Sequence, residues 1–332
     1  MLSIGKVCLN SQIHYFRLRL VKQQIIQMKT LSLTLACTFI FSAITAQPPQ
    51  ASSYGLNNIN LPAALDKQVC ISGMKSYNGQ LYMASERCPE IIVFDPVKAV
   101  ITNTIAIQVP QPFEMEGLTS YKDKLYGISE NVAAVYEINI QTGEVKEVAT
   151  SNTLHPKSKD GDGMEGIAAN EKHNKFYLLR ERNDNKSKSE IYTYNIETGS
   201  GNSPYTLKYE SMIELPLENS QWRYSDICVD KANNRLVCLK SYSKGKLREQ
   251  YLESLDIDDA GNISVASLKN IPVENFTDAS KSFKTQRYSM NLEGITIDDN
   301  SGTIYIVSDN TSGKANCDLD AKDKTILLEL KK

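Results

Sequence analysis

From about residue 54 onward, short runs of alternating apolar and polar residues fill the chain, with polar turns of Asn, Gly, Lys and Asp between them. Successive side chains of a β-strand point to opposite faces of a sheet, so a period of two residues predicts strands. The runs are rich in Ile, Val and Tyr, which favour strands. The pattern has no competing helical periodicity. It predicts an all-β protein.

The runs recur as a larger unit that consists of a short apolar run, a polar turn, a second run, a loop and a third alternating run. A fourth run often follows. The copies begin at Cys70, Met115, Met164, Tyr224 and Leu292. A unit of this size cannot bury its own faces, so neighbouring units must stack around an axis. The sequence predicts a β-propeller over residues 68–332, with five four-stranded repeats.

The last copy ends after three strands. The N-terminal segment YGLNNINLPAAL, residues 54–65, is therefore expected to supply the missing outer strand and to close the ring. The long interval between Asp226 and Glu293 leaves six blades as the alternative. Residues 271–289 in that interval are expected to form a loop and not three strands, which favours five blades.

The N-terminal region has the composition of a targeting segment. Residues 28–46 carry one lysine, then an uncharged apolar run and small residues, as in a secretory signal peptide. The run is short for a transmembrane span, so no membrane span is expected after signal cleavage. Residues 1–27 are an upstream extension or follow a mis-called start codon, and residues 47–67 form an N-terminal segment. A lipoprotein anchor at Cys37 is not favoured, because the apolar run continues past it. The sequence predicts a secreted or periplasmic monomer.

Residues 1–46 contain five Lys/Arg residues and no Asp or Glu. The remaining, exported part of the chain therefore has more acidic than basic residues. This balance disfavours nucleic acid as a partner and is compatible with bound cations. The absence of CxxC pairs and of Cys/His clusters disfavours structural zinc.

The repeats carry acids at two recurring positions. In a propeller blade, the first strand is innermost and the second returns antiparallel to it, so the start of one and the end of the other share one end of the ring. The first position holds Ser72, Glu116, Glu165, Asp226 and Glu293. The second holds Glu86, Glu130, Glu181, Ser241 and Asp309. Both sets are expected to converge on one mouth of the central channel.

Carboxylates that converge without basic partners have raised pKa values unless a cation neutralises them. Oxygen ligands without His or Cys favour Ca²⁺. The acids of both positions, Asp226 included, are therefore the candidate metal ligands. In the alternative, they form a structural rim that meets solvent or pairs with Arg87, Arg182 and Arg223. The glycines that follow three of the glutamates are expected to permit close strand packing and a bulge.

Two arginines, Arg87 and Arg182, directly follow acids of the second position. They could bind the oxygens of an anionic substrate, such as a phosphate, or they could pair with neighbouring acids. Cys88 and Cys317 occupy the same loop in the first and last copies, which ring closure makes neighbours. A Cys88–Cys317 disulfide is therefore predicted.

With these residues in place, the chain resembles the β-propellers of the SdiA-regulated and esterase-like-phytase type. The resemblance lies in EGI or EGL at Glu116, Glu165 and Glu293, in the ER pairs Glu86-Arg87 and Glu181-Arg182 after the second strand, and in SDN at 308–310. It implies a secreted or periplasmic propeller with calcium in or near its channel and, in some relatives, phosphoester or ester hydrolysis. The five-repeat count is also similar to that of calcium-activated nucleotidases.

Two functions follow from these observations. In the first, a non-catalytic propeller binds Ca²⁺ and uses the same face to bind a small anionic ligand or an envelope or extracellular partner. In the second, the protein is a Ca²⁺-dependent phosphoesterase or esterase. The chain has no GxSxG elbow, P-loop, HExxH or RHG motif, so the catalytic residues are not identified and the first function is favoured.

Overall fold

The computed structural model describes residues 53–109, 114–152, 154, 162–199, 203–245, 247–274, 276–310 and 316–332. The predicted extension, the predicted signal peptide and Cys37 lie outside these residues. Within them, no helix combines the length and the apolar character that a membrane span requires.

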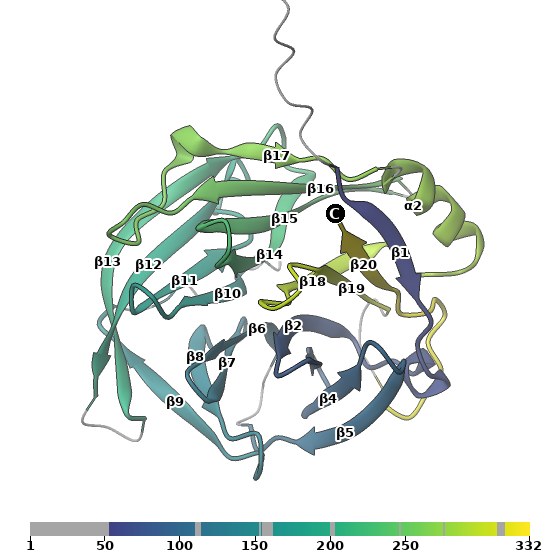
Figure 1. Cartoon of the computed structure of the whole chain (residues 1–332), viewed down its shortest axis with the longest axis horizontal. Helices are drawn as coiled ribbons and strands as arrows, with labels where there is room; N and C mark the ends of the chain where they lie inside the picture. Colours follow the sequence, from purple (N-terminus) through teal and green to yellow (C-terminus); the bar gives the residue numbers. More distant parts are fainter. Residues whose placement is uncertain are drawn as a thin grey trace, which may run out of the picture. The chain divides into compact units, whose positions relative to one another are not determined.

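The sheets of the described residues divide into five four-stranded units, here called blades 1 to 5 (Figure 1). Blade 1 consists of β2 (Ile71–Tyr77), β3 (Gln80–Ser85), β4 (Glu90–Asp95) and β5 (Val100–Ala106). Blade 2 consists of β6 (Met115–Tyr121), β7 (Lys124–Ser129), β8 (Ala134–Ile138) and β9 (Val145–Thr150). Blade 3 consists of β10 (Met164–Asn170), β11 (Lys175–Arg180), β12 (Lys188–Thr198) and β13 (Tyr205–Pro216). Blade 4 consists of β14 (Trp222–Asp230), β15 (Arg235–Lys244), β16 (Leu247–Asp256) and β17 (Lys269–Ile271). Blade 5 consists of β18 (Asn291–Ile297), β19 (Ile304–Asp309), β20 (Leu327–Lys331) and β1 (Gly55–Ile59).

The predicted β-propeller is confirmed. The inner strands β2, β6, β10, β14 and β18 each pack against the next, and β18 packs against β2, so the ring is closed. The N-terminal strand β1 pairs antiparallel with β20 and completes blade 5. The prediction that residues 54–65 supply this outer strand is therefore confirmed.

The hydrophobic core lies between the blades. Both faces of most inner strands are buried, and each of five buried clusters joins two neighbouring blades. The cluster between blades 5 and 1, for example, packs Tyr305 and Val307 against Ile71, Met74 and Phe94. Burial of a side chain of this size stabilises the folded state by roughly 1.5–3 kcal/mol. No blade could retain this burial alone, so the ring folds as one unit.

Three features differ from the sequence-based expectation or go beyond it. Residues 271–289 contain the α-helix α2 (Phe276–Thr285) and not only loop, and this helix lies outside the ring beside β16 (Figure 1). The short helix η2 (Val265–Ser267) precedes β17, and η1 (Ala63–Asp66) follows β1. Outer strands β9 and β13 pair in parallel, which joins blades 2 and 3 into one eight-stranded sheet.

Candidate functional site at one mouth of the ring

The inner hairpins share a bulge at the end where their first strands begin. In blades 1, 2, 3 and 5 the register skips the residue before a glycine. The skipped residues are Ser72, Glu116, Glu165 and Glu293. Each glycine lies where two inner strands nearly touch: a Cβ on Gly117 would lie 2.8 Å from the backbone nitrogen of Ile167. The structure therefore shows both the close strand packing at the glycines and the bulge that the sequence predicted.

Blade 4 departs from this pattern, and the sequence alignment of Asp226 with the glutamates is wrong. Its register shift lies between Tyr224 and Asp226, so Ser225 occupies the bulge and Asp226 takes the glycine position. The Asp226 carboxylate accepts hydrogen bonds from the backbone amides of Ile227 (2.8 Å) and Ile295 (2.9 Å). Burial raises the pKa of Asp226 well above its usual range, although these two bonds oppose the shift. Asp226 therefore links β14 to β18.

The acids of both recurring positions lie at the same end of the ring, here called the acidic mouth. The register pairs Met115 with Ser129, so Glu116 and Glu130 lie at one end of their hairpin. The other hairpins follow the same rule. The buried members of the acidic mouth are Glu116, Glu130, Glu165, Glu181, Glu293 and Asp309, and Glu86 is half-buried. Ser72 and Ser241 take the equivalent positions in blades 1 and 4.

Two carboxylates of the acidic mouth have no hydrogen-bond or ion-pair partner among the described residues. Glu116 is 6% exposed and Glu165 is 8% exposed. Burial raises the pKa of Glu116 well above its usual range, and the nearby Glu86 and Glu130 raise it further. Burial and Glu181 do the same for Glu165. Because each group is costly to ionise where it lies, each must be protonated or neutralised by a cation.

Glu116 belongs to a cluster of three carboxylates. One oxygen each from Glu86, Glu114 and Glu116 lies within 4.8 Å of the others. The sequence had not identified Glu114, although it stands two residues before Glu116 in the loop that enters β6. Arg87 donates to Glu86 at 2.8 Å and lies 3.8 Å from Glu114. An all-carboxylate donor set is of the kind that hard cations such as Ca²⁺ prefer.

Blades 3 to 5 contain the opposite arrangement, in which acids of the mouth are paired. Arg223 of β14 donates to Glu181 at 2.6 Å, to Glu293 at 2.5 Å and to Asn291 at 3.0 Å. Burial raises the pKa of Glu181 and that of Glu293 to about 7, and Arg223 opposes both shifts. The alternative in which acids of the mouth pair with an arginine therefore holds for Glu181 and Glu293, whereas Glu116 and Glu165 have no such pairing among the described residues.

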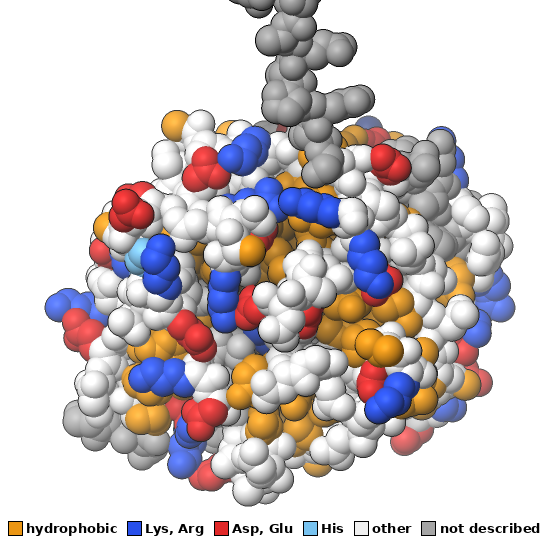
Figure 2. All heavy atoms as spheres, viewed as in Figure 1, with side chains coloured by type: hydrophobic (Ala, Val, Ile, Leu, Met, Phe, Trp, Pro, Cys, Tyr) orange, Lys and Arg blue, Asp and Glu red, His pale blue; other side chains and the backbone are white. Residues whose placement is uncertain are grey.

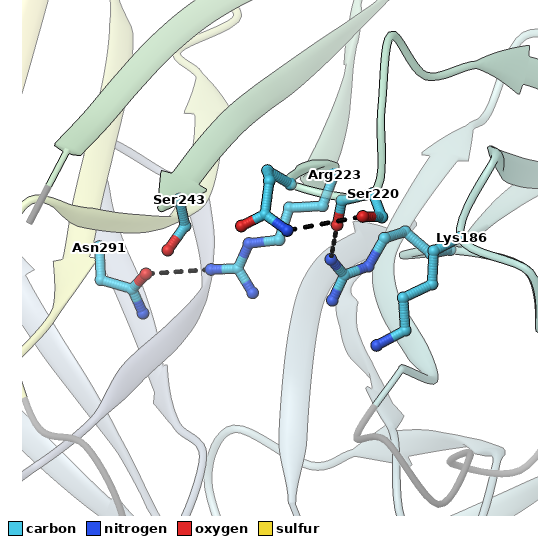
Figure 3. A pocket seen from close by; sticks show the side chains of 7 residues that line it. Lys186, Ser220, Arg223, Ser243 and Asn291 are labelled. Carbon is cyan, nitrogen blue, oxygen red and sulfur yellow. Dashed lines mark hydrogen bonds between the residues drawn. The ribbon is translucent and has the colours of Figure 1, made fainter. Parts of the chain in front are cut away.

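A cavity of about 420 Å³ lies beside the Arg223 guanidinium and is called here the basic cavity. Its lining residues are Arg182, Lys186, Ser220, Gln221, Arg223, Ser243 and Asn291. Figure 3 shows Asn291 and Ser243 on one side of Arg223 and Ser220 and Lys186 on the other. Arg182 binds Asp162 through two of its nitrogens and donates to the backbone oxygen of Ser220 at 2.9 Å. Lys186 lies 3.2 Å from the second Asp162 oxygen.

The two arginines that the sequence proposed for ligand binding are thus placed differently. Arg182 lines the basic cavity, whereas Arg87 lies with Glu86 and Glu114 and is not part of the lining. Lys186, Ser220, Gln221, Ser243 and Asn291 carried no sequence signal as a group, because they come from loops and strand ends of three different blades.

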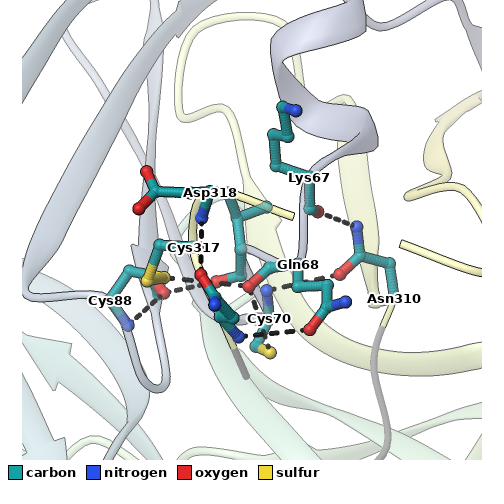
Figure 4. Close-up of a disulfide and its surroundings, with 10 residues drawn as sticks. Lys67, Gln68, Cys70, Cys88, Asn310, Cys317 and Asp318 are labelled. Carbon is teal, nitrogen blue, oxygen red and sulfur yellow. Dashed lines mark hydrogen bonds between the residues drawn. A yellow bond between two sulfur atoms is a disulfide. The ribbon is translucent and has the colours of Figure 1, made fainter. Parts of the chain in front are cut away.

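The structure contains the predicted Cys88–Cys317 disulfide, with the two Cα atoms 6.0 Å apart (Figure 4). It joins blade 1 to the loop between β19 and β20 of blade 5. In the same view, the amide of Asn310 donates to the backbone oxygen of Lys67 at 2.6 Å. A disulfide of this kind favours an oxidising compartment.

Charged side chains of both signs are interspersed on the face shown in Figure 2, and neither sign forms a large patch there. A concentration of charge is found instead in the buried acidic mouth.

A closed ring of stacked four-stranded sheets with a charged site at one mouth defines a β-propeller protein. The family model described as phytase-like, with the esterase-like activity of phytase, matches residues 73–311. This match covers most of the chain, and the chain belongs to this phytase-like family. A comparison with curated proteins found no match.

Solved structures with a similar fold have low sequence identity. Glutaminyl cyclase from Myxococcus xanthus is 12% identical, with a TM-score of 0.45, over 85% of this chain and 99% of that chain. Hydrazine synthase from Kuenenia stuttgartiensis is 11% identical, with a TM-score of 0.42, over 72% of this chain and 73% of that chain. Similarities of this size support no statement about the site or the activity of this protein.

Proposed function

We propose that this protein is an exported, calcium-binding propeller that binds a small anionic ligand at the acidic mouth. The single observation that carries the calcium site is the buried carboxylate of Glu116, which has no partner among the described residues and lies within 4.8 Å of Glu86 and Glu114 oxygens. Arg87 supplies one positive charge to this cluster. A divalent cation would supply the remaining charge and would lower the pKa of Glu116.

Calcium takes six to eight oxygen ligands, so the three carboxylates would supply part of its shell. Bound there, the ion would rigidify the entry of β6 against the end of β3. The basic cavity on blades 3 to 5 would hold the anion, because Arg182, Lys186 and Arg223 all line it. Export is supported by the composition of residues 28–46 and by the disulfide.

The test compares thermal unfolding in Ca²⁺ and in EDTA for the native protein, for Glu116→Gln and for Glu144→Gln. Glu144 is an exposed glutamate that pairs with Lys146 at 3.4 Å and lies outside the acidic mouth, so it is a matched control. Calcium should raise the Tm of the native protein and of Glu144→Gln but not that of Glu116→Gln. Identical native melting curves in Ca²⁺ and EDTA would refute the calcium site.

The family match favours hydrolysis as the second function. Glu181 and Glu293 contact the Arg223 guanidinium beside the basic cavity, and their pKa values of about 7 suit general acid–base catalysis near neutral pH. Turnover of aryl phosphates, nucleotides, phytate and short esters tests this function. Activity that survives replacement of Glu181 and Glu293 together by glutamine would remove these two acids from any mechanism.

A further inference from the structure

The described residues that line the basic cavity are all polar. Their seven side chains end in guanidinium, ammonium, hydroxyl or amide groups. Ligand pockets are usually mostly apolar, with a few polar groups that fix orientation. A cavity of about 420 Å³ with this lining therefore favours a compact ligand that forms many hydrogen bonds.

Several of these polar groups retain hydrogen-bonding capacity. The Ser243 hydroxyl has no hydrogen-bond partner among the described residues. The Gln221 amide makes one long bond, at 3.5 Å, to the Ser220 hydroxyl. These groups can both donate and accept, as the hydroxyls of a sugar ring require. A simple oxyanion, which only accepts, would leave the acceptor capacity of these groups unused.

The positive charge of the basic cavity is largely balanced by acids behind it. Asp162 pairs with Arg182 and Lys186, and Glu181 and Glu293 pair with Arg223. Three cations thus face three acids. The basic cavity therefore carries little net positive charge, which favours a singly charged ligand over a dianion.

An aromatic cluster fixes the strand ends that carry this lining. The Trp222 ring lies 5.0 Å from Tyr242 and 5.5 Å from Tyr251, and the Lys240 ammonium lies 5.3 Å from the centre of the indole. Trp222 stands between the lining residues Gln221 and Arg223. The lining is therefore held in place before a ligand arrives, which reduces the entropic cost of binding.

We propose that the basic cavity binds a sugar acid, such as a hexuronic acid unit, through one carboxylate and several ring hydroxyls. The carboxylate would lie against Arg182, Lys186 and Arg223, and the hydroxyls against Ser220, Gln221, Ser243 and Asn291. This assignment rests on the proposed function, because it specifies the anionic ligand that binds at the acidic mouth.

The test is isothermal titration calorimetry with digalacturonic acid, lactose, glucose 6-phosphate and inorganic phosphate, each with the native protein. Digalacturonic acid should bind at least about tenfold more tightly than the other three compounds. Lys186→Gln should weaken its binding about tenfold, since it removes one of the three cations. Lys208→Gln is the matched control, because it removes an exposed lysine whose pairing partner is Glu197. Ser243→Ala provides a second variant, with an expected loss of about fivefold, should Lys186→Gln fail to fold.

The outcomes separate this assignment from the proposed function. Tighter binding of glucose 6-phosphate or phosphate would overturn the sugar acid but leave an anion-binding site. Equal binding of lactose would overturn the role of the carboxylate. Absence of binding by all four compounds, in a protein that still binds Ca²⁺ in a separate titration, would overturn both ligand assignments and leave the calcium site. Equal losses in Lys186→Gln and Lys208→Gln would place the ligand elsewhere.

Discussion

Replacement of Arg223 by methionine tests the electrostatics of the acidic mouth most sharply. The guanidinium contacts Glu181 at 2.6 Å and Glu293 at 2.5 Å, and both carboxyls are buried. Methionine retains apolar volume but leaves two buried carboxyls without their cation. Removal of one partner from a buried ion pair costs about 3–5 kcal/mol. For a chain of this size, that cost corresponds to a decrease in Tm of about 6–12 °C.

The loss of stability caused by Arg223→Met should depend on pH in a defined direction. The pKa values of Glu181 and Glu293 are raised from 4.5 to about 7, so the folded state binds protons more tightly than the unfolded state. Their contribution to stability is complete below pH 4.5 and is lost as pH rises through about 7. Without Arg223 their pKa values rise further. The difference between native protein and Arg223→Met should therefore be small at pH 5, about 1 kcal/mol, and about 3–5 kcal/mol at pH 8.

The assay is urea unfolding followed by far-UV circular dichroism at pH 5 and pH 8, which avoids the fluorescence of the adjacent Trp222. Arg287→Met is the control, because Arg287 is exposed and its guanidinium donates to the backbone oxygen of Lys322, away from the acidic mouth. The control should lose less than about 1 kcal/mol at both pH values. An equal loss at pH 5 and pH 8 for Arg223→Met, or a loss at pH 8 no larger than that of the control, would refute the reasoning.

Two further predictions concern ring closure and strand packing. Replacement of both Cys88 and Cys317 by alanine opens a loop of sequence separation 229 and should lower the free energy of unfolding by up to about 5 kcal/mol. Equal stability of this variant and the native protein, measured by urea unfolding under oxidising conditions, would contradict this prediction. Gly117→Ala places a Cβ 2.8 Å from a backbone nitrogen of the next blade and should lower the free energy of unfolding by about 1–3 kcal/mol. Gly55→Ala is its control, because the nearest contact of the new Cβ would be 3.7 Å, and it should cost under about 1 kcal/mol. Similar midpoints in chemical denaturation for the two variants would show that the inner ring is not tightly packed.

Much of the fold could be predicted because alternation and repeat length are local properties of the sequence. The closing strand was predictable as well, since the last repeat lacks its outer strand and residues 54–65 have a strand pattern. The helix α2 was not, because its ten-residue sequence FTDASKSFKT is short and mostly polar and lies between turn-forming segments.

The candidate site was predictable only where the repeat fixes a residue by register. Glu116, Glu165 and Glu293 stand before a glycine, and the bulge aligns them. Asp226 was misplaced by one position, because an acid at the glycine position looks in sequence like an acid at the bulge. Glu114 was missed, since the loop before β6 has no counterpart in the repeat pattern. The bridging role of Arg223 depends on side chains from three blades, which no single repeat reveals.

The central claim is that a calcium ion binds Glu86, Glu114 and Glu116. The most direct measurement is an anomalous difference map from crystals grown with Ca²⁺ and from crystals grown with EDTA. A peak among these three carboxylates that is present with Ca²⁺, lost with EDTA and lost in Glu116→Gln would agree with the account. A peak elsewhere in the acidic mouth, for example beside Glu165, or no peak in crystals that contain Ca²⁺, would contradict it.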